Sequence, residues 1–240
     1  MIKVAQCWDD GLSTDRRLIE MLRKYGAKAT FNLTPGRHGE ERVEAYWTPQ
    51  GYSGWSCRGF IGGRLSKHEL LETYSGFRVA SHCMKHEHAG QIPDESFIRA
   101  ALDARHYLED LFQQECPGFA WPCGAYTRPL ADALLAAGFE YGRTTGNCGG
   151  DVSQYEHPML LCPNCHYQDC AFYDLYEKAK QDGDNFFYFW GHTYEMQDSE
   201  GMWKQLEDKI RFICDDPDAV WCDVIDIVRA DKSSVTSANV

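Results

Sequence analysis

The segment KVAQCWDDG (residues 3–11) is a short apolar run that stops at two adjacent carboxylates and a glycine. A run of this length predicts a buried β-strand over residues 3–8. Asp9 and Asp10 then place two negative charges where the strand leaves the core. One interpretation is a plain turn, because Asp-Gly is a common turn pair. The other is a reactive site at the end of a strand, and the rest of the chain decides between them.

Further segments of this kind follow along the chain and alternate with amphipathic patterns. Strands are expected at residues 3–8, 28–33, 77–82, 117–122, 141–145, 185–192 and 219–222. Helices are expected at residues 13–26, 66–75, 93–112, 128–138, 169–183, 201–216 and 223–230. Residues 36–64 and most of 146–170 are expected to be loops. Strands that alternate with helices predict βαβ units and a parallel sheet, and about seven pairs favour a barrel over an open sheet.

Polar, reactive side chains, together with the WPCGAY motif, occur at the ends of these strands. They are Asp9 and Asp10 in WDDG, His82, His86 and His88 in SHCMKHEH, Trp121, Pro122 and Tyr126 in WPCGAY, Arg143 in GRTT, and His192 in WGHTYE. In a barrel of parallel strands the chemistry gathers at the carboxyl ends. We therefore expect these side chains to surround one site.

His82 and His86 have the spacing of a pair of metal ligands. Two histidines and one carboxylate form a familiar catalytic zinc site, and the same set suits iron(II). Either Asp9 or Asp10 could supply the carboxylate. Because adjacent strand residues point to opposite sides, one aspartate as ligand and the other as general base is a natural division. His192 could then protonate a leaving group.

At this point the motifs resemble those of the NodB-type polysaccharide deacetylases, the family 4 carbohydrate esterases. CWDDG is similar to their first motif, HCMKH to the second, WPCGAY to the third and FYFWGH to the last. The order and spacing agree over residues 1 to about 195. Each motif alone is weak evidence, but four in order, each at a strand end, are specific.

The resemblance implies a fold, a reaction and a role for each residue. The fold is a distorted (β/α)7 barrel of the α/β class, which here would be one catalytic domain over residues 1–240. The reaction is metal-assisted hydrolysis of an N-acetyl amide, or sometimes an O-acetyl ester, on a sugar. Asp9 would be the general base, Asp10, His82 and His86 the metal ligands, and His192 the general acid. A backbone N–H between Trp121 and Tyr126 would stabilise the oxyanion.

The chain departs from the family pattern in two places. The family usually has an arginine two residues before the proline of the third motif, and Ala120 stands there. We expect Arg143 to supply that guanidinium instead. The proline that often follows the second metal-binding histidine is Glu87 here.

Residues that would contact the substrate are also predicted. Trp121, Pro122, Tyr126 and His166 are the candidates. The aromatic segment 46–60 is either a wall for sugar rings or a packed surface loop.

Composition limits the partners and the compartment. The net charge is −12, with no Lys/Arg cluster, so a nucleic-acid partner is not expected. No apolar run reaches the length of a membrane helix and no secretory leader is evident, so we expect a cytoplasmic protein that binds no membrane. Eleven cysteines cannot all pair, and reduced thiols are expected. The oligomeric state stays open.

The expected cofactor is one divalent metal ion. Zinc is favoured, but the same ligands also bind cobalt, nickel, manganese or iron. A second, structural zinc at Cys162, Cys165 and Cys170, with His166 close by, is an open alternative.

Two other functions remain open at this stage. One is a metal-dependent C–N hydrolase that acts on a small amide or ureide with the same barrel. The other is a non-catalytic, sugar-binding relative, for which the missing arginine of the third motif is the only support.

Overall fold

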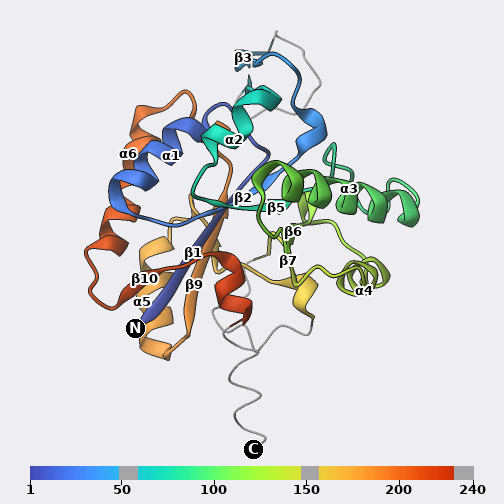
Figure 1. Cartoon of the computed structure of the whole chain (residues 1–240). Helices are drawn as coiled ribbons and strands as arrows, with labels where there is room; N and C mark the ends of the chain where they lie inside the picture. Colours follow the sequence, from blue (N-terminus) through green and yellow to red (C-terminus); the bar gives the residue numbers. More distant parts are fainter. Residues whose placement is uncertain (49–58, 147–156, 230–240) are drawn as a thin grey trace, which may run out of the picture.

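The computed structural model describes residues 1–48, 59–146 and 157–229. Two long, neighbouring strands lie at its centre, β1 (Ile2–Asp9) and β9 (Phe186–Gly191), with helices around them (Figure 1). They pair in parallel from Lys3–Phe186 to Trp8–Gly191. Almost every residue of β1 is buried, as expected for a parallel strand that is covered on both faces.

The described strands form a curled parallel sheet that closes on itself. Their order is β7-β6-β5-β2-β1-β9-β8. The remaining bounds are β2 (Thr30–Leu33), β5 (Arg78–Ser81), β6 (Gly118–Ala120), β7 (Tyr141–Arg143) and β8 (Cys165–His166). The segment just before β8 pairs with the β7 edge, because the Leu161 N–H donates to the Gly142 carbonyl at 2.7 Å and its carbonyl accepts from the Thr144 N–H at 2.8 Å. The fold is a distorted (β/α)7 barrel, as predicted.

One expected strand has a different place in the sheet. Residues 219–222 do form a strand, β10 (Ala219–Trp221), but it pairs with the amino-terminal half of β1, from Ile2 to Val4. β2 pairs with the other half of β1, at Cys7–Asp9, so β10 lies outside the closing ring. The last position of the ring belongs to β8, which comes from a segment expected to be loop. Two residues are too short a run to give a strand signal.

The helices cover the outside of the barrel (Figure 1). Their bounds are α1 (Asp15–Tyr25), α2 (Leu70–Thr73), α3 (Asp94–Phe112), α4 (Arg128–Ala136), α5 (Phe172–Asp182) and α6 (Glu200–Cys214), and residues 224–229 are helical as well. Short 3₁₀ turns occur at η1 (Pro35–Arg37), η2 (Lys67–Glu69), η3 (Pro122–Gly124), η5 (Pro158–Leu160) and η6 (Thr193–Met196). The expected helix 66–75 is therefore split into η2 and α2. None of the described helices has the length and apolar character of a membrane span.

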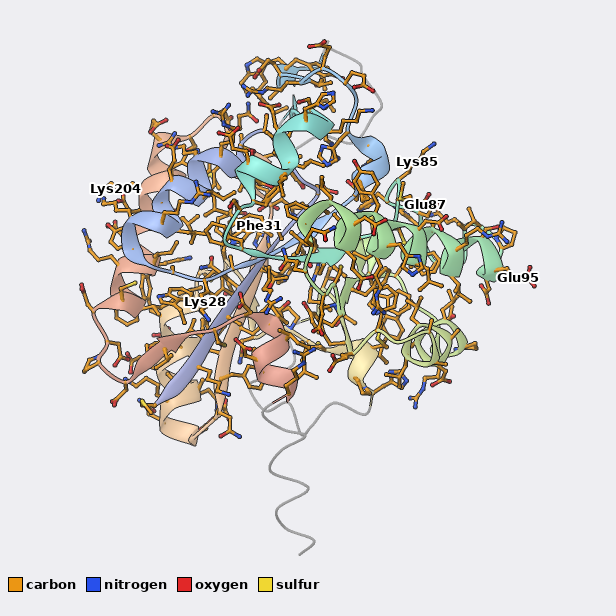
Figure 2. The ribbon with its side chains drawn as sticks, viewed as in Figure 1. Lys28, Phe31, Lys85, Glu87, Glu95 and Lys204 are labelled. Carbon is orange, nitrogen blue, oxygen red and sulfur yellow. The ribbon has the colours of Figure 1, made fainter. Side chains whose placement is uncertain are left out.

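The core lies between the strands and these helices. Figure 2 shows Phe31 of β2 in the interior, whereas Lys204 of α6 and Glu95 of α3 lie at the outside. Two short antiparallel strands, β3 (Tyr46–Trp47) and β4 (Phe60–Ile61), lie at one end of the molecule, outside the parallel sheet. The rest of the aromatic segment, residues 49–58, lies outside the described residues.

Candidate active site and metal centre

The turn after β1 sends the two aspartates in different directions. Asp9 is the last residue of the strand, while Asp10 has a φ of 83° and Gly11 a φ of 71°. Such a conformation is strained for a residue with a side chain, and hydrogen bonds hold Asp10 in it. Its N–H donates to the Asn32 carbonyl at 2.9 Å, and its carbonyl accepts from the Thr34 hydroxyl at 3.1 Å.

Gly11 leaves room for a buried imidazole. A Cβ at this position would lie 2.7 Å from Nε2 of His38. The His38 ring is fixed from its other side, because Nδ1–H donates to the Leu65 carbonyl at 2.8 Å. Both the backbone angle and this close approach therefore require glycine in the first motif.

Asp9 is held by two buried side chains. Asn32 donates to its Oδ1 at 2.7 Å, and Arg143 donates to its Oδ2 in a short ion pair. Burial alone would raise the pKa of Asp9, but Arg143 and the neighbouring histidines hold that pKa well below its usual range. Asp9 is therefore a carboxylate at neutral pH.

Asp10, His82 and His86 form a cluster with the dimensions of a metal site. Their ligand atoms all lie within 4.8 Å of one another. Nδ1–H of His82 donates to the Ala120 carbonyl at 2.8 Å, which leaves the lone pair of Nε2 facing the cluster. Among the described residues, both this Nε2 and Oδ1 of Asp10 are buried without a hydrogen-bond partner. Two buried, unpaired acceptors from this ligand set fit one divalent metal ion.

A third histidine of the loop after β5, His88, lies beside His86 of this cluster. Nδ1 of His86 lies 3.3 Å from Nε2 of His88, which lies 3.4 Å from the Cys123 thiol. His88 therefore supports the ring of His86 from behind. Glu87 takes no part, since its carboxylate accepts from the Lys85 N–H at 2.7 Å. Figure 2 shows Lys85 and Glu87 together at the outer side of this loop.

His192 approaches Asp9 from the end of β9. Its Nε2 lies 3.8 Å from Oδ2 of Asp9, and its Nδ1 lies 3.3 Å from Glu195. Burial would lower the pKa of His192, but the Glu195 hydrogen bond and the charge of Asp9 raise it above its ordinary value. Glu195 also contacts Nε2 of His166 at 3.2 Å.

These groups open into one pocket of about 920 Å³. Its described lining residues are Asp9, Asp10, Leu12, Arg37, Val43, Tyr46, Ile61, Gly62, Arg64, His82, His86, His88, Trp121, Cys123, Thr145, Trp190, His192 and Tyr194. The pocket thus contains both carboxylates, the histidines that follow β5 and β9, and several aromatic rings.

Some predicted substrate contacts lie elsewhere. Trp121 lines the pocket, and its ring N–H donates to the Met159 carbonyl at 2.6 Å. Pro122 is buried behind it and does not line the pocket. Tyr126 lies on the surface and packs on Trp121 with 6.1 Å between the rings. His166 does not line the pocket itself, but it contacts Glu195 at 3.2 Å and its ring packs on Trp190, which does.

Other residues of the site were missed from the sequence. Asn32 lies one residue before the end of the second strand and Glu195 lies three residues after His192, so each had a weak signal of position. Arg37 and Arg64 lie in the predicted loop 36–64, where sequence alone gives no direction for a side chain.

The structure does not bring the three cysteines around 165 together. Cys162 is disulfide-bonded, whereas Cys165 and Cys170 are free thiols, the first buried and the second exposed. None of the His, Cys, Asp and Glu clusters found in the described part of the chain includes these cysteines. The general expectation of reduced thiols is therefore wrong for Cys162.

Comparison with known proteins identifies the family and the fold. The sequence model of the polysaccharide deacetylase family matches residues 2–142. No curated protein sequence matches the chain.

Solved structures share the fold at low sequence identity. A probable polysaccharide deacetylase from Pseudomonas aeruginosa PAO1 has a TM-score of 0.67 at 12% identity, over 95% of this chain and 90% of that one. The peptidoglycan deacetylase PdaC from Bacillus subtilis has a TM-score of 0.55 at 12% identity, over 99% and 95%. A family 4 acetyl xylan esterase from Clostridium thermocellum, in complex with a cobalt ion, has a TM-score of 0.55 at 12% identity, over 95% and 91%.

Proposed function

Because the chain belongs to the polysaccharide deacetylase family, we propose that it is a metal-dependent hydrolase that removes acetyl groups from an N-acetylated or O-acetylated saccharide. One observation carries the proposal: the two adjacent aspartates differ in their main contacts, although His82 lies near both. Asp9 contacts Arg143, and its Oδ2 lies 3.8 Å from His192. Asp10 faces His82 and His86. With such a division, Asp9 can act as the base while Asp10 acts as a metal ligand.

Asp10, His82 and His86 would hold the metal ion, with zinc favoured by two imidazoles and one carboxylate. When bound, the ion would polarise the acetyl carbonyl and lower the pKa of a water molecule toward about 7. The carbonyl of Ala120 fixes the ring of His82, and His88 supports His86. Each of the two histidine ligands is therefore held in orientation by a contact on the side of its ring away from the metal.

Asp9 would accept the proton of the attacking water. Arg143 and Asn32 keep the carboxylate ionised and fix its orientation, so that Oδ2 faces both His82 and His192. This arrangement places the base between the metal ligands and the general acid.

His192 would donate a proton to the leaving nitrogen or oxygen. Its pKa is raised by Glu195 and Asp9, which favours the protonated ring at the start of the reaction. The N–H of Cys123, which lines the pocket directly after Pro122, would stabilise the oxyanion.

The aromatic lining suits a saccharide. Tyr46, Trp121, Trp190 and Tyr194 all border the pocket. Aromatic faces pack against the apolar C–H faces of sugar rings. A small amide or ureide would not fill a pocket of about 920 Å³.

The proposal includes a cytoplasmic location, in which the substrates would be small, soluble saccharides. The described cysteines other than Cys162 are free thiols, in keeping with a reducing compartment. The disulfide at Cys162 is the observation against it. Fractionation of cells that express the tagged protein decides the point.

Acetate release from a panel of acetylated saccharides tests the function. Asp9→Asn should lower kcat by about 10²- to 10⁴-fold while bound metal, measured by elemental analysis, stays near that of the parent. Asp132→Asn, an exposed carboxylate on α4, is the matched control and should keep full activity. Unchanged turnover in Asp9→Asn would refute the mechanism. Release of ammonia or a ring-opened acid, without acetate, would favour the C–N hydrolase instead.

The geometry removes the one argument for a non-catalytic relative, which was the missing arginine of the third motif. Ala120 stands where the family has its arginine, but the guanidinium of Arg143 contacts Asp9 from the next strand. The chain therefore does not lack an arginine beside the first aspartate.

A further inference from the structure

We propose that Arg37 and Arg64 form a binding site for an anionic group of the substrate, so that the preferred substrate is an acetylated saccharide that carries a carboxylate or a phosphate. The inference rests on the proposed function, since it concerns the same pocket. Both arginines belong to the lining of the pocket that contains the metal cluster.

Arg64 is a fixed and mostly buried cation. Its backbone pairs with Val43 through two hydrogen bonds of 2.7 and 2.9 Å, and its side chain is 18% exposed. One Nη donates to the carbonyl of Asp10, and the other lies 3.9 Å from the Asp10 carboxylate. The carboxylate that Arg64 faces is therefore a proposed metal ligand.

Arg37 adds a second cation beside the first. It ends the 3₁₀ turn η1, directly after β2. Its side chain makes no hydrogen bond or ion pair with any residue in the described ranges. Its charge lowers the pKa of Arg64, His86 and Cys123, so it lies close to all three. The two arginines repel each other across the pocket.

Among the carboxylates of the described lining, Asp10 lies 3.9 Å from Arg64, but it also belongs to the metal cluster. Asp9 is paired with Arg143, and Asp10 is committed to the metal cluster. A protein with a net charge of −12 offers many acidic groups, yet they lie elsewhere. Guanidiniums attract planar or tetrahedral oxyanions and bind them through paired N–H donors. A substrate anion would relieve the repulsion between Arg37 and Arg64.

Binding can be measured without turnover in the zinc-loaded Asp9→Asn protein. The probes are neutral N-acetylglucosamine, N-acetylglucosamine 6-phosphate and N-acetylmuramic acid, titrated by calorimetry. At least one acidic probe should bind about tenfold or more tightly than the neutral one. Its affinity should fall as salt rises from about 0.05 to 0.5 M, because Arg37 is exposed and its field is screened. Whichever of the two acidic probes binds more tightly shows whether the site prefers a phosphate or a carboxylate.

Variants of Arg37 and Arg64 test whether these two residues cause the preference for acidic probes. Arg37→Gln, in the same Asp9→Asn background, should weaken the acidic probe about tenfold and leave the neutral probe within about twofold. Arg64→Lys keeps the charge beside Asp10 but loses the paired donors, so it should weaken the acidic probe as well. Arg128→Gln on α4, which removes one positive charge outside the pocket, is the control and should change neither.

Two results would overturn the anion site: equal affinity for neutral and acidic probes, or a preference that survives Arg37→Gln. Failure of the proposed deacetylase function would give a different set of results. If the wild-type protein releases acetate equally fast from all probes, deacetylation stands and the anion site falls. If acidic probes bind in an Arg37-dependent way but no acetylated saccharide is hydrolysed, the anion site stands and deacetylation falls.

Discussion

The ion pair of Arg143 with Asp9 is fully buried and joins β7 to β1. Arg143→Gln would leave Asp9 buried without its cation, and breaking such a pair costs about 3–5 kcal/mol. The folded-state pKa of Asp9 is depressed, so this stabilisation is present above the unfolded pKa of about 3.9 and is lost as pH falls. The gap in unfolding free energy between parent and variant should be full at pH 7 and should narrow below about pH 4. Urea unfolding across this pH range measures it, with Arg143→Lys as the charge-preserving comparison. A gap that does not change with pH would mean that the charge of Asp9 is not what Arg143 stabilises.

Glu195 sets the proton affinity of the general acid. It hydrogen-bonds His192, so Glu195→Gln should lower the pKa of that imidazole. A protonated His192 is required, and the alkaline limb of the pH–rate profile should therefore move to lower pH. Activity at pH 8 should fall more than activity at pH 6. A uniform loss at every pH would instead assign Glu195 a purely structural role.

At the level of single residues, the sequence predicted the candidate site residues that lie at or just after the ends of apolar runs. Asp9, Asp10 and His192 directly follow or end apolar runs, and His82 and His86 follow a third. Arg37 and Arg64 could not be predicted in this way, because their directions depend on how a long irregular segment folds back over β1 and β2. Side chains that act through another residue, such as Glu195, carry no pattern of their own.

The turn between β1 and α1 is the element on which the metal cluster depends. Gly11→Ala would place a methyl group 2.7 Å from Nε2 of His38 and would strain a φ of 71°. Gly26→Ala, at the end of α1, has a similar φ of 63° but no atom within 4 Å, so it reports the cost of the angle alone, about 1–2 kcal/mol. Gly11→Ala should cost more in urea unfolding and should also weaken zinc binding, since Asp10 precedes it. Equal costs for the two variants would show that the His38 contact yields without strain.

Elements with long apolar runs were predicted well, and short ones were not. The helix predicted at 93–112 matches α3 closely, because a repeating apolar face fixes both ends. β8 is two residues long and pairs with β9, and Leu161 just before it pairs with Arg143 of β7; both are contacts between residues distant in sequence. Likewise β10 was predicted as a strand, but only its pairing partner reveals that it lies outside the ring. Periodicity predicts an element; it does not predict the neighbour that the element pairs with.

For the whole molecule, metal binding should stabilise the fold. Asp10 Oδ1 and His82 Nε2 are buried and unpaired among the described residues, so the metal-free protein bears their desolvation cost. Zinc at 100 times its Kd adds about 2.7 kcal/mol, and for a chain of this size each kcal/mol shifts Tm by about 2–4 °C. Chelation should therefore lower Tm by about 5–10 °C, reversibly, as calorimetry or circular dichroism can follow. The double variant His82→Gln, His86→Gln should have the same Tm with and without zinc, whereas replacement of His106 on the outer side of α3 should keep the full shift. A parent Tm that ignores both zinc and chelator would mean that the cluster holds no metal, and the metal-dependent mechanism would fall with it.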